Sequence, residues 1–110
     1  MPFRHTVLEF MRFEWNPDKN ELLKGTRDVS YEEIATFLAA GKVWKVMDHP
    51  NPETYPNQQV FLVPIDGYIY FVPFIIEEGV IFLKTAFPHR KATKQYLELV
   101  PATTSTMIPM

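Results

Sequence analysis

Three consecutive apolar segments between residues 59 and 87 constrain the fold more than any other feature of this chain. They read QVFLVPI, YIYFVPFII and VIFLKTAF, and they are rich in the β-branched and aromatic residues that favour strands. The turn sequences Asp66-Gly67 and EEG, ending at Gly79, separate them. The pattern predicts a three-stranded meander.

Two further segments have strand character. TVLEFMRFEW, residues 6–15, alternates apolar and polar side chains imperfectly, and KVWKVMDHP, residues 42–50, leads into a loop with the sequence NPETYPN. Prolines cannot donate to a β-ladder, so this loop separates a strand over residues 43–49 from the meander. We therefore expect a sheet of four or five strands, mostly antiparallel.

Two helices are predicted between the first strand and the rest of the sheet. Asn16 is suited to cap a helix over residues 17–24, with Pro17 as its first residue and Gly25 as a left-handed stop. The next helix has the best-defined start in the chain, because VSYEEI contains a capping box and an apolar pair at staple spacing.

In that capping box Ser30 is the N-cap and Glu33 its partner, with Val29 and Ile34 as the staple. Gly41 then ends the helix. A last, short helix is predicted after Arg90 with Thr93 as its N-cap. We expect one domain over residues 1–100 and a flexible tail over 101–110.

The register of the meander follows from its two-residue turns, which pair Pro73 with Lys84. Since Pro73 has no ladder donor, a bulge or an edge is expected there. The bulkier sheet face is expected to be core-facing: Phe61, Tyr70, Phe74, Leu83 and Phe87. The opposite face carries Phe71, Phe82 and Ala86, and we expect a partner protein to cover it.

Composition excludes several classes of function. The 110 residues suit a single domain with one site, and the absence of cysteine removes disulfides and thiolate chemistry. Three scattered histidines suggest no metal site, and we expect no cofactor. No apolar stretch is long enough to span a membrane, so we expect a cytoplasmic protein. Because the net charge is -2, any nucleic-acid contact must come from a local basic patch.

Three motifs resemble the BrnT toxins of bacterial type II toxin-antitoxin systems. FEWNPDK is similar to the family's FEWD-P-x-K, and VSYEEI is similar to its VSFEEA. Thirteen residues separate Trp15 of the first motif from the start of the second. PHRKATKQYLE is similar in part to its S-A-R-x-A-T-x-x-E, matching at Arg90, Ala92 and Thr93. The likeness covers residues 13–98. It departs at Thr26-Arg27-Asp28, where the family has Lys-His-Gly, at Pro88-His89 and at Tyr96.

The resemblance implies a RelE/ParE-like α+β fold, with two N-terminal helices on a small antiparallel sheet and a C-terminal helix after the last strand. It also implies a metal-free endoribonuclease that cleaves RNA, free or on the ribosome, to inhibit translation and growth. A cognate antitoxin would hold it inactive in a hetero-oligomer. Other readings are a non-catalytic protein of the same fold that binds a topoisomerase, or a regulatory subunit bound to an antitoxin.

A basic cluster in the stretch LKTAFPHRKATKQYL supplies the candidate catalytic residues. Arg90 can hold two phosphate oxygens with its planar guanidinium, and Lys84 adds a point charge from the preceding strand. His89 is suited to acid or base chemistry near neutral pH, although it could equally be a surface residue of a turn. We predict catalytic roles for Arg90, Lys84 and His89.

Further cations are candidates for RNA binding. Positive charge near a helix N-terminus opposes the helix dipole, so stability does not account for this cluster, whereas a bound anion would. That anion is RNA or an acidic antitoxin segment, and the alternative is a solvated patch. The predicted RNA-binding residues are Lys91, Lys94, Lys24, Arg27, His49 and Tyr55. Ordinary loop charges at Lys24 and Arg27, and a turn histidine held by Asp48, are the competing interpretations.

Overall fold

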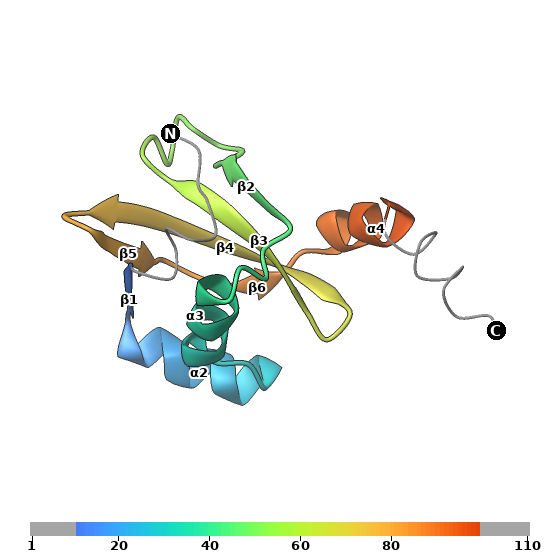
Figure 1. Cartoon of the computed structure of the whole chain (residues 1–110), viewed down its shortest axis with the longest axis horizontal. Helices are drawn as coiled ribbons and strands as arrows, with labels where there is room; N and C mark the ends of the chain where they lie inside the picture. Colours follow the sequence, from blue (N-terminus) through green and yellow to red (C-terminus); the bar gives the residue numbers. More distant parts are fainter. Residues whose placement is uncertain (1–10, 100–110) are drawn as a thin grey trace.

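The computed structural model describes residues 11–99 and has an α+β fold. In chain order its elements are β1 (Arg12–Trp15), α2 (Pro17–Arg27), α3 (Tyr31–Ala39), β2 (Lys45–Asp48), β3 (Gln59–Ile65), β4 (Tyr68–Glu77), β5 (Val80–Leu83), β6 (Phe87–Pro88) and α4 (Arg90–Leu99) (Figure 1). The start of the predicted first strand and the predicted tail over 101–110 lie outside the described residues. None of the described helices is long and apolar enough to cross a membrane.

The sheet is mixed and has six strands, where four or five mostly antiparallel strands were expected. Its order is β1-β5-β4-β3-β2, and β6 pairs with β4 beyond the end of β5. All pairings are antiparallel except that of β1 with β5, which aligns Arg12 with Val80 in a parallel register. Parallel neighbours need a long connection between them, which the two helices and three strands between β1 and β5 provide.

The predicted meander is present as β3, β4 and β5. Ile65 pairs with Tyr68, and Glu77 pairs with Val80, so each hairpin is closed by two residues. All four turn residues have positive φ, as type I′ turns require: Asp66 (51°), Gly67 (83°), Glu78 (51°) and Gly79 (80°). The turn chemistry therefore determines the register of this part of the sheet.

The predicted irregularity beside Pro73 is a bulge that reverses the faces of the next residues. The backbone N–H of Lys84 still donates to the Pro73 carbonyl at 2.8 Å, after which pairing breaks off and resumes with Phe71 opposite Phe87. An unbroken ladder would have paired Phe71 with Ala86 instead. Because of this one extra residue, Ala86 joins the helix-facing core and Phe87 lies on the opposite face with Phe71, so the faces predicted for these two residues were wrong. The other residues predicted to face the core are confirmed there: Phe61, Tyr70, Phe74 and Leu83.

Helix α2 begins as predicted but ends later. The Asn16 side chain accepts hydrogen bonds from the backbone of Asp18 (2.8 Å) and Lys19 (3.2 Å). The helix continues through Gly25 to Arg27, so the predicted stop at Gly25 was wrong. Asp28 is the C-cap, with φ 59°, and its N–H donates to the Lys24 carbonyl at 3.2 Å. Aspartate adopts this left-handed conformation more readily than most residues, which explains why glycine was not required.

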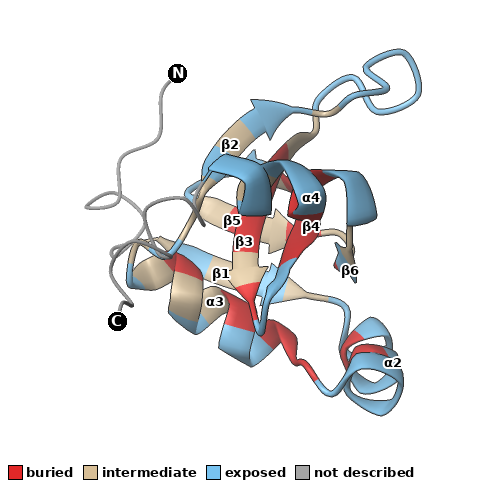
Figure 2. Cartoon of the chain, turned by 90° about the vertical axis from the view of Figure 1, so that its right-hand side faces the viewer, coloured by how far each residue is buried: buried red, intermediate tan, exposed pale blue. Residues whose placement is uncertain are grey.

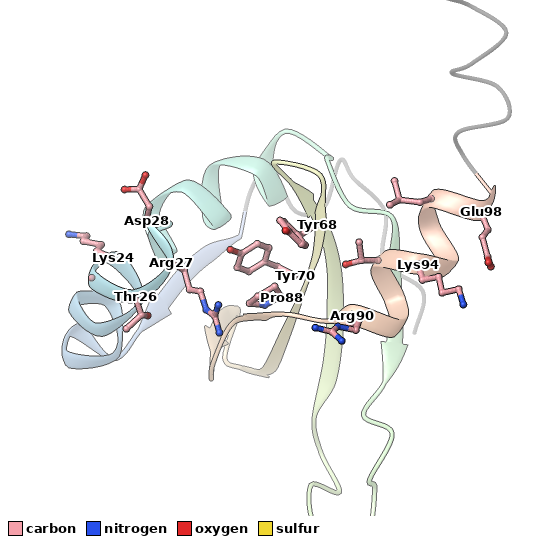
Figure 3. A pocket seen from close by; sticks show the side chains of 13 residues that line it. Lys24, Thr26, Arg27, Asp28, Tyr68, Tyr70, Pro88, Arg90, Lys94 and Glu98 are labelled. Carbon is pink, nitrogen blue, oxygen red and sulfur yellow. The ribbon is translucent and has the colours of Figure 1, made fainter.

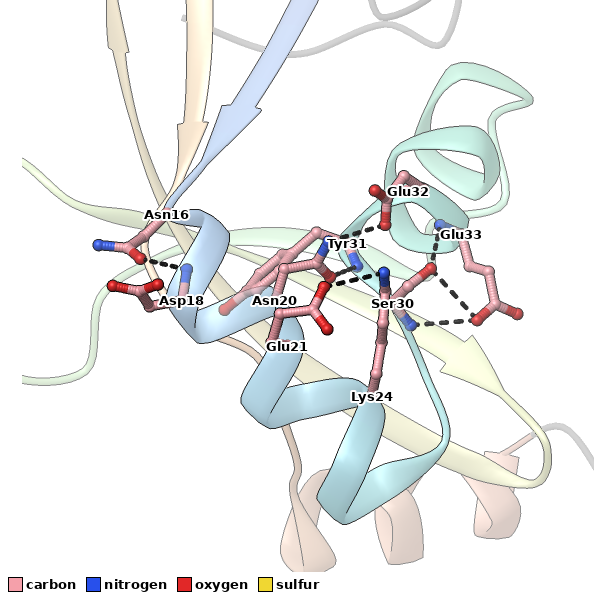
Figure 4. Close-up of polar contacts among 9 residues, drawn as sticks. All are labelled: Asn16, Asp18, Asn20, Glu21, Lys24, Ser30, Tyr31, Glu32 and Glu33. Atoms are coloured by element: carbon pink, nitrogen blue, oxygen red, sulfur yellow. Dashed lines mark hydrogen bonds and ion pairs between the residues drawn. The ribbon is translucent and has the colours of Figure 1, made fainter.

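Helix α3 follows the sequence prediction. The Ser30 hydroxyl accepts from the Glu33 backbone at 3.1 Å, and a Glu33 carboxylate oxygen accepts from the Ser30 backbone at 3.0 Å. A buried Asn20 joins the two helices: its Oδ1 accepts from the Tyr31 backbone at 2.8 Å and its Nδ2 donates to Glu32 at 2.9 Å (Figure 4). These contacts hold the start of α3 against α2 without any help from the sheet.

Two apolar clusters lie on opposite faces of the sheet. The first packs α2 and α3 against the sheet, and its largest members include Tyr31, Ile34, Leu38, Phe61, Phe74 and Leu83. The second packs α4 against the other face and comprises Val60, Leu62, Ile69, Phe71 and Ala92, with Trp44 and Tyr96 at its margin. Buried residues accordingly concentrate in the central strands β3 and β4 (Figure 2). The face expected to await a partner is thus covered in part by α4.

Helix α4 starts four residues earlier than a helix capped by Thr93 would. His89 precedes it, and the Nδ1 atom of His89 accepts from the Ala92 backbone at 3.1 Å. Thr93, the predicted N-cap, lies inside the helix and is buried. Its hydroxyl oxygen accepts from the Ile69 backbone at 2.8 Å and donates to the His89 carbonyl at 2.7 Å, so it fastens α4 to β4. The prediction of Thr93 as N-cap was therefore wrong.

Candidate active site

Two cavities lie on either side of the short strand β6. The smaller, of about 600 Å³, is called here the histidine cavity, and its lining includes His49, Tyr55, Phe71, Lys84 and His89. The larger, of about 1100 Å³, is called the arginine groove, and its lining includes Lys24, Arg27, Tyr68, Arg90, Lys94 and Leu97 (Figure 3). The predicted site residues other than Lys91 are thus divided between two neighbouring cavities.

Strand β6 and the start of α4 that follows it explain this division. Phe87 and His89 line the histidine cavity, whereas Pro88 and Arg90 line the arginine groove. Successive residues of a strand point to opposite sides, as Phe87 and Pro88 of β6 do, and His89 and Arg90 lie at the turn into α4 and line different cavities. The three predicted catalytic residues are consequently split, with Lys84 and His89 in one cavity and Arg90 in the other.

The histidine cavity is walled by packed rings from separate parts of the chain. His49, at the end of β2, has its ring centroid 4.4 Å from that of Tyr55 in the following loop. His89 stacks on Phe71 of β4 at 4.9 Å, and Phe87 lies 5.3 Å from the same ring. The cavity therefore brings together residues that are about forty positions apart in the sequence.

Both imidazoles are held through Nδ1. The Nδ1 atom of His49 accepts from the Asn51 backbone at 3.0 Å, just as that of His89 accepts from Ala92 at 3.1 Å. An acceptor nitrogen carries no proton, so each neutral ring bears its proton on Nε2. In this arrangement each histidine offers an N–H donor, and neither offers a basic lone pair.

Lys84 follows β5 directly, and its backbone contacts both α2 and β4. Its carbonyl accepts from the Lys19 ammonium at 2.8 Å, which ties α2 to the end of β5. Its own ammonium lies 5.3 Å from the centre of the Phe82 ring. Among residues 11–99, no Asp or Glu lines the histidine cavity, although Glu77 lines a neighbouring cavity together with Lys84.

The arginine groove runs between the end of α2 and α4. Among residues 11–99, Arg27, Arg90 and Lys94 make no ion pair, while Lys24 pairs with Glu21 at 3.2 Å. Figure 3 shows Arg27 extending from α2 towards Tyr70 and Pro88. Burial raises the pKa of Tyr70 above its ordinary value, and the charge of Arg27 opposes this shift.

Charge is strongly segregated towards these two cavities. Of the ten Lys and Arg residues between positions 11 and 99, six line one or the other, but only two of the twelve Asp and Glu residues in that range do, namely Asp28 and Glu98. A chain with a net charge of -2 therefore presents a locally positive surface around β6. Such a surface favours an anionic ligand.

Sequence reasoning placed most of the candidate residues, with one exception and several omissions. Lys91 is exposed and lines neither cavity. The residues that were missed are Lys19, Phe71, Phe87 and Tyr68. Lys19 could have been found, since it ends the FEWNPDK motif. The aromatic residues could not, because their sequence pattern is that of ordinary strand residues and the bulge that places Phe87 in the cavity lining is a tertiary feature.

Residues 11–99 contain no group of three His, Asp or Glu side chains arranged to hold a metal ion, so the site does not resemble a metal centre. Comparisons of the chain with protein-family models, with curated proteins and with solved structures found no match.

Proposed function

We propose that this protein is an endoribonuclease toxin, similar to the BrnT toxins, that cleaves cytoplasmic RNA without a metal ion to stop translation and growth. The observation that carries the proposal is the convergence of Lys84, His89 and His49 on one cavity, whose lining among residues 11–99 contains no carboxylate. A phosphodiester is the anion that such a set of donors would suit. The FEWNPDK and VSYEEI motifs and the order of strand, two helices, sheet and helix also support it.

The reaction we propose is an internal transfer. The ribose 2′-oxygen attacks phosphorus, the bond from phosphorus to the 5′-oxygen breaks, and the products carry a 2′,3′-cyclic phosphate and a 5′-hydroxyl. The 2′-proton passes to water, and the Lys84 ammonium gives a proton to the leaving 5′-oxygen and regains one from water. The Nε2–H groups of His89 and His49 donate to the phosphate oxygens as negative charge grows on them.

Arg90 has a supporting part in this proposal. Its side chain lines the arginine groove, so it contacts a phosphate next to the cleaved one. A cognate antitoxin would inhibit the toxin by covering the positive surface around β6 in a hetero-oligomer. The RelE/ParE-like fold assignment belongs to the same proposal, with the parallel β1 as a difference from the antiparallel sheet that the resemblance implies.

One observation favours a second candidate function. Because both histidines hold their Nδ1 atoms in backbone hydrogen bonds, neither is arranged as a general base. A non-catalytic toxin of the same fold, one that binds a topoisomerase, or a regulatory subunit bound to an antitoxin, would need these rings only for binding. Growth arrest with intact RNA and signs of DNA damage would support the topoisomerase version.

The test is cleavage of single-stranded RNA by the purified protein in EDTA, with the product ends analysed. We expect cyclic phosphate ends from the native chain and a large loss of cleavage in Lys84→Met. His89→Asn preserves a capping oxygen before α4 while removing the imidazole, so it tests His89 without removing the helix cap. Lys42→Gln, outside both cavities, is the matched charge control. Absence of cleavage of RNA, both free and on ribosomes, would reject the enzymatic proposal.

A further inference from the structure

The arginine groove is too large to be explained by the cleaved phosphate alone. We propose that it binds the single-stranded RNA flanking the scissile bond, so that one strand passes from the histidine cavity over Pro88 into the groove. This inference rests on the proposed function and adds a second, non-catalytic part to its substrate site. The groove, of about 1100 Å³, exceeds the usual range of about 300–1,000 Å³ for small-molecule pockets, which favours an extended chain over one compact ligand.

Continuity between the two cavities is the first argument. Pro88 lines the groove, and its neighbours Phe87 and His89 line the histidine cavity, so a ridge one residue wide separates them. A strand lying across this ridge meets Lys84 and His89 on one side and Arg90 on the other. It need not pass around a helix or through the core to reach both.

The cations of the groove are the second argument. Arg27 comes from the end of α2, and Arg90 and Lys94 come from the first two turns of α4, yet all three line one groove. None of them has an ion-pair partner among residues 11–99. Three unpaired cations spread along a groove suit the repeated charges of a nucleic-acid backbone.

Exposed apolar side chains in the groove are the third argument. Tyr68, the first residue of β4, keeps 57% of its surface exposed, and Leu97 of α4 keeps 46%. Tyr70, two residues further along the strand, is buried and forms part of the groove lining. An exposed tyrosine ring beside cations is the arrangement that stacks bases in single strands without reading their sequence.

An acidic peptide is the principal competing occupant. It would use the same cations, and like RNA it would face Asp28 and Glu98 in the lining, but it would gain nothing from stacking on Tyr68. The stacking surface therefore favours RNA. The experiment separates the two ligands through Tyr68, because only a base stacks strongly on its ring.

The experiment measures binding of labelled 2′-O-methyl RNAs, which cannot be cleaved, in lengths of two, four and six nucleotides by fluorescence anisotropy. We expect the native chain to bind six nucleotides at least tenfold more tightly than two. Arg27→Gln and Tyr68→Ala should lose most of this gain, while Lys42→Gln keeps it. Arg27→Gln should also lower the slope of log affinity against log salt concentration by about 0.7, as loss of one phosphate contact to a single strand predicts, and Tyr68→Ala should leave that slope unchanged.

Several outcomes would overturn the inference. Equal affinity for two and six nucleotides would do so, as would equal length dependence in Arg27→Gln and Lys42→Gln. Tighter binding of a labelled hexaglutamate, unaffected by Tyr68→Ala, would assign the groove to an acidic peptide. Cleavage of long single-stranded RNA, free and on ribosomes, is measured in parallel. Cleavage without length-dependent binding rejects this inference alone, and length-dependent binding without any cleavage rejects the enzymatic proposal alone.

Discussion

The backbone N–H of Ala92 donates a hydrogen bond to Nδ1 of His89 across 3.1 Å. This one contact caps helix α4 and also fixes the imidazole with Nε2–H as its remaining polar group. The ring stacks on Phe71 at 4.9 Å, so its plane is held as well. The sequence predicted an acid or base role for His89. In the structure His89 is instead a helix cap whose Nε2–H is available as a hydrogen-bond donor.

Removal of this cap should destabilise the protein. We expect His89→Ala to lower the free energy of unfolding by about 1 kcal/mol, because the Ala92 N–H loses its acceptor. His89→Asn should recover most of this loss, since asparagine is among the preferred N-cap residues. Urea denaturation of the two variants and the native chain makes the comparison. Equal stability of the two variants would show that His89 stabilises α4 by packing rather than by capping.

Lys84 should affect catalysis far more than affinity. In the proposed reaction its ammonium acts on the leaving oxygen only as the bond breaks, so we expect Lys84→Met to slow cleavage by about 10²–10³-fold. Binding of an uncleavable RNA should change much less. Single-turnover rates and anisotropy measure the two effects separately, with Lys42→Gln as control. A loss confined to binding would assign Lys84 a role in holding the substrate.

Thr93 should be important for stability despite its place inside a helix. Its hydroxyl satisfies the Ile69 backbone N–H in a buried position, so Thr93→Val should leave that donor unpaired and cost about 1–3 kcal/mol. Thr36→Val is the matched control, because the Thr36 hydroxyl only donates to the Glu32 carbonyl within its own exposed helix turn. Thermal unfolding followed by circular dichroism measures both. Similar losses in the two variants would contradict the role assigned to Thr93.

The contact between Asn20 and Glu32 should contribute to the acid sensitivity of the fold. The Asn20 side chain is the main cause that lowers the pKa of Glu32 below its ordinary value. A carboxyl whose pKa is lower in the folded state stabilises it above the unfolded pKa, and this contribution is lost as the pH falls through the folded value. We therefore expect Glu32→Gln to lose less stability than the native chain between about pH 5 and 3.

The measurement is the melting temperature of native, Glu32→Gln and Glu53→Gln proteins across that pH range. Glu53 lies in the exposed loop after β2 and serves as control. If the melting temperatures of Glu32→Gln and Glu53→Gln fall equally as the pH is lowered, the Asn20 contact makes no contribution to pH-dependent stability.

Local chemistry explains which parts of the fold could be predicted from sequence. The capping box at Ser30 and Glu33 and the two hairpin turns depend on residues within four positions of each other, and all were predicted correctly. The end of α2 and the start of α4 were not predicted correctly. Asp28 caps the end of α2 and His89 caps the start of α4, and both residue types are common in many other places. Aspartate at positive φ and histidine as an N-cap leave weak signals.

The sequence by itself determined the meander, the α2–α3 pair and the gathering of cations near residues 84–94, since each follows from neighbouring residues and their spacing. Only the tertiary structure decided how those cations are used. The bulge beside Pro73 shifts the chain by one residue, and after β6 the chain turns into α4 so that His89 and Arg90 line different cavities. A ladder slip of this kind depends on how β4 pairs with β5 and β6, which no short stretch of sequence contains.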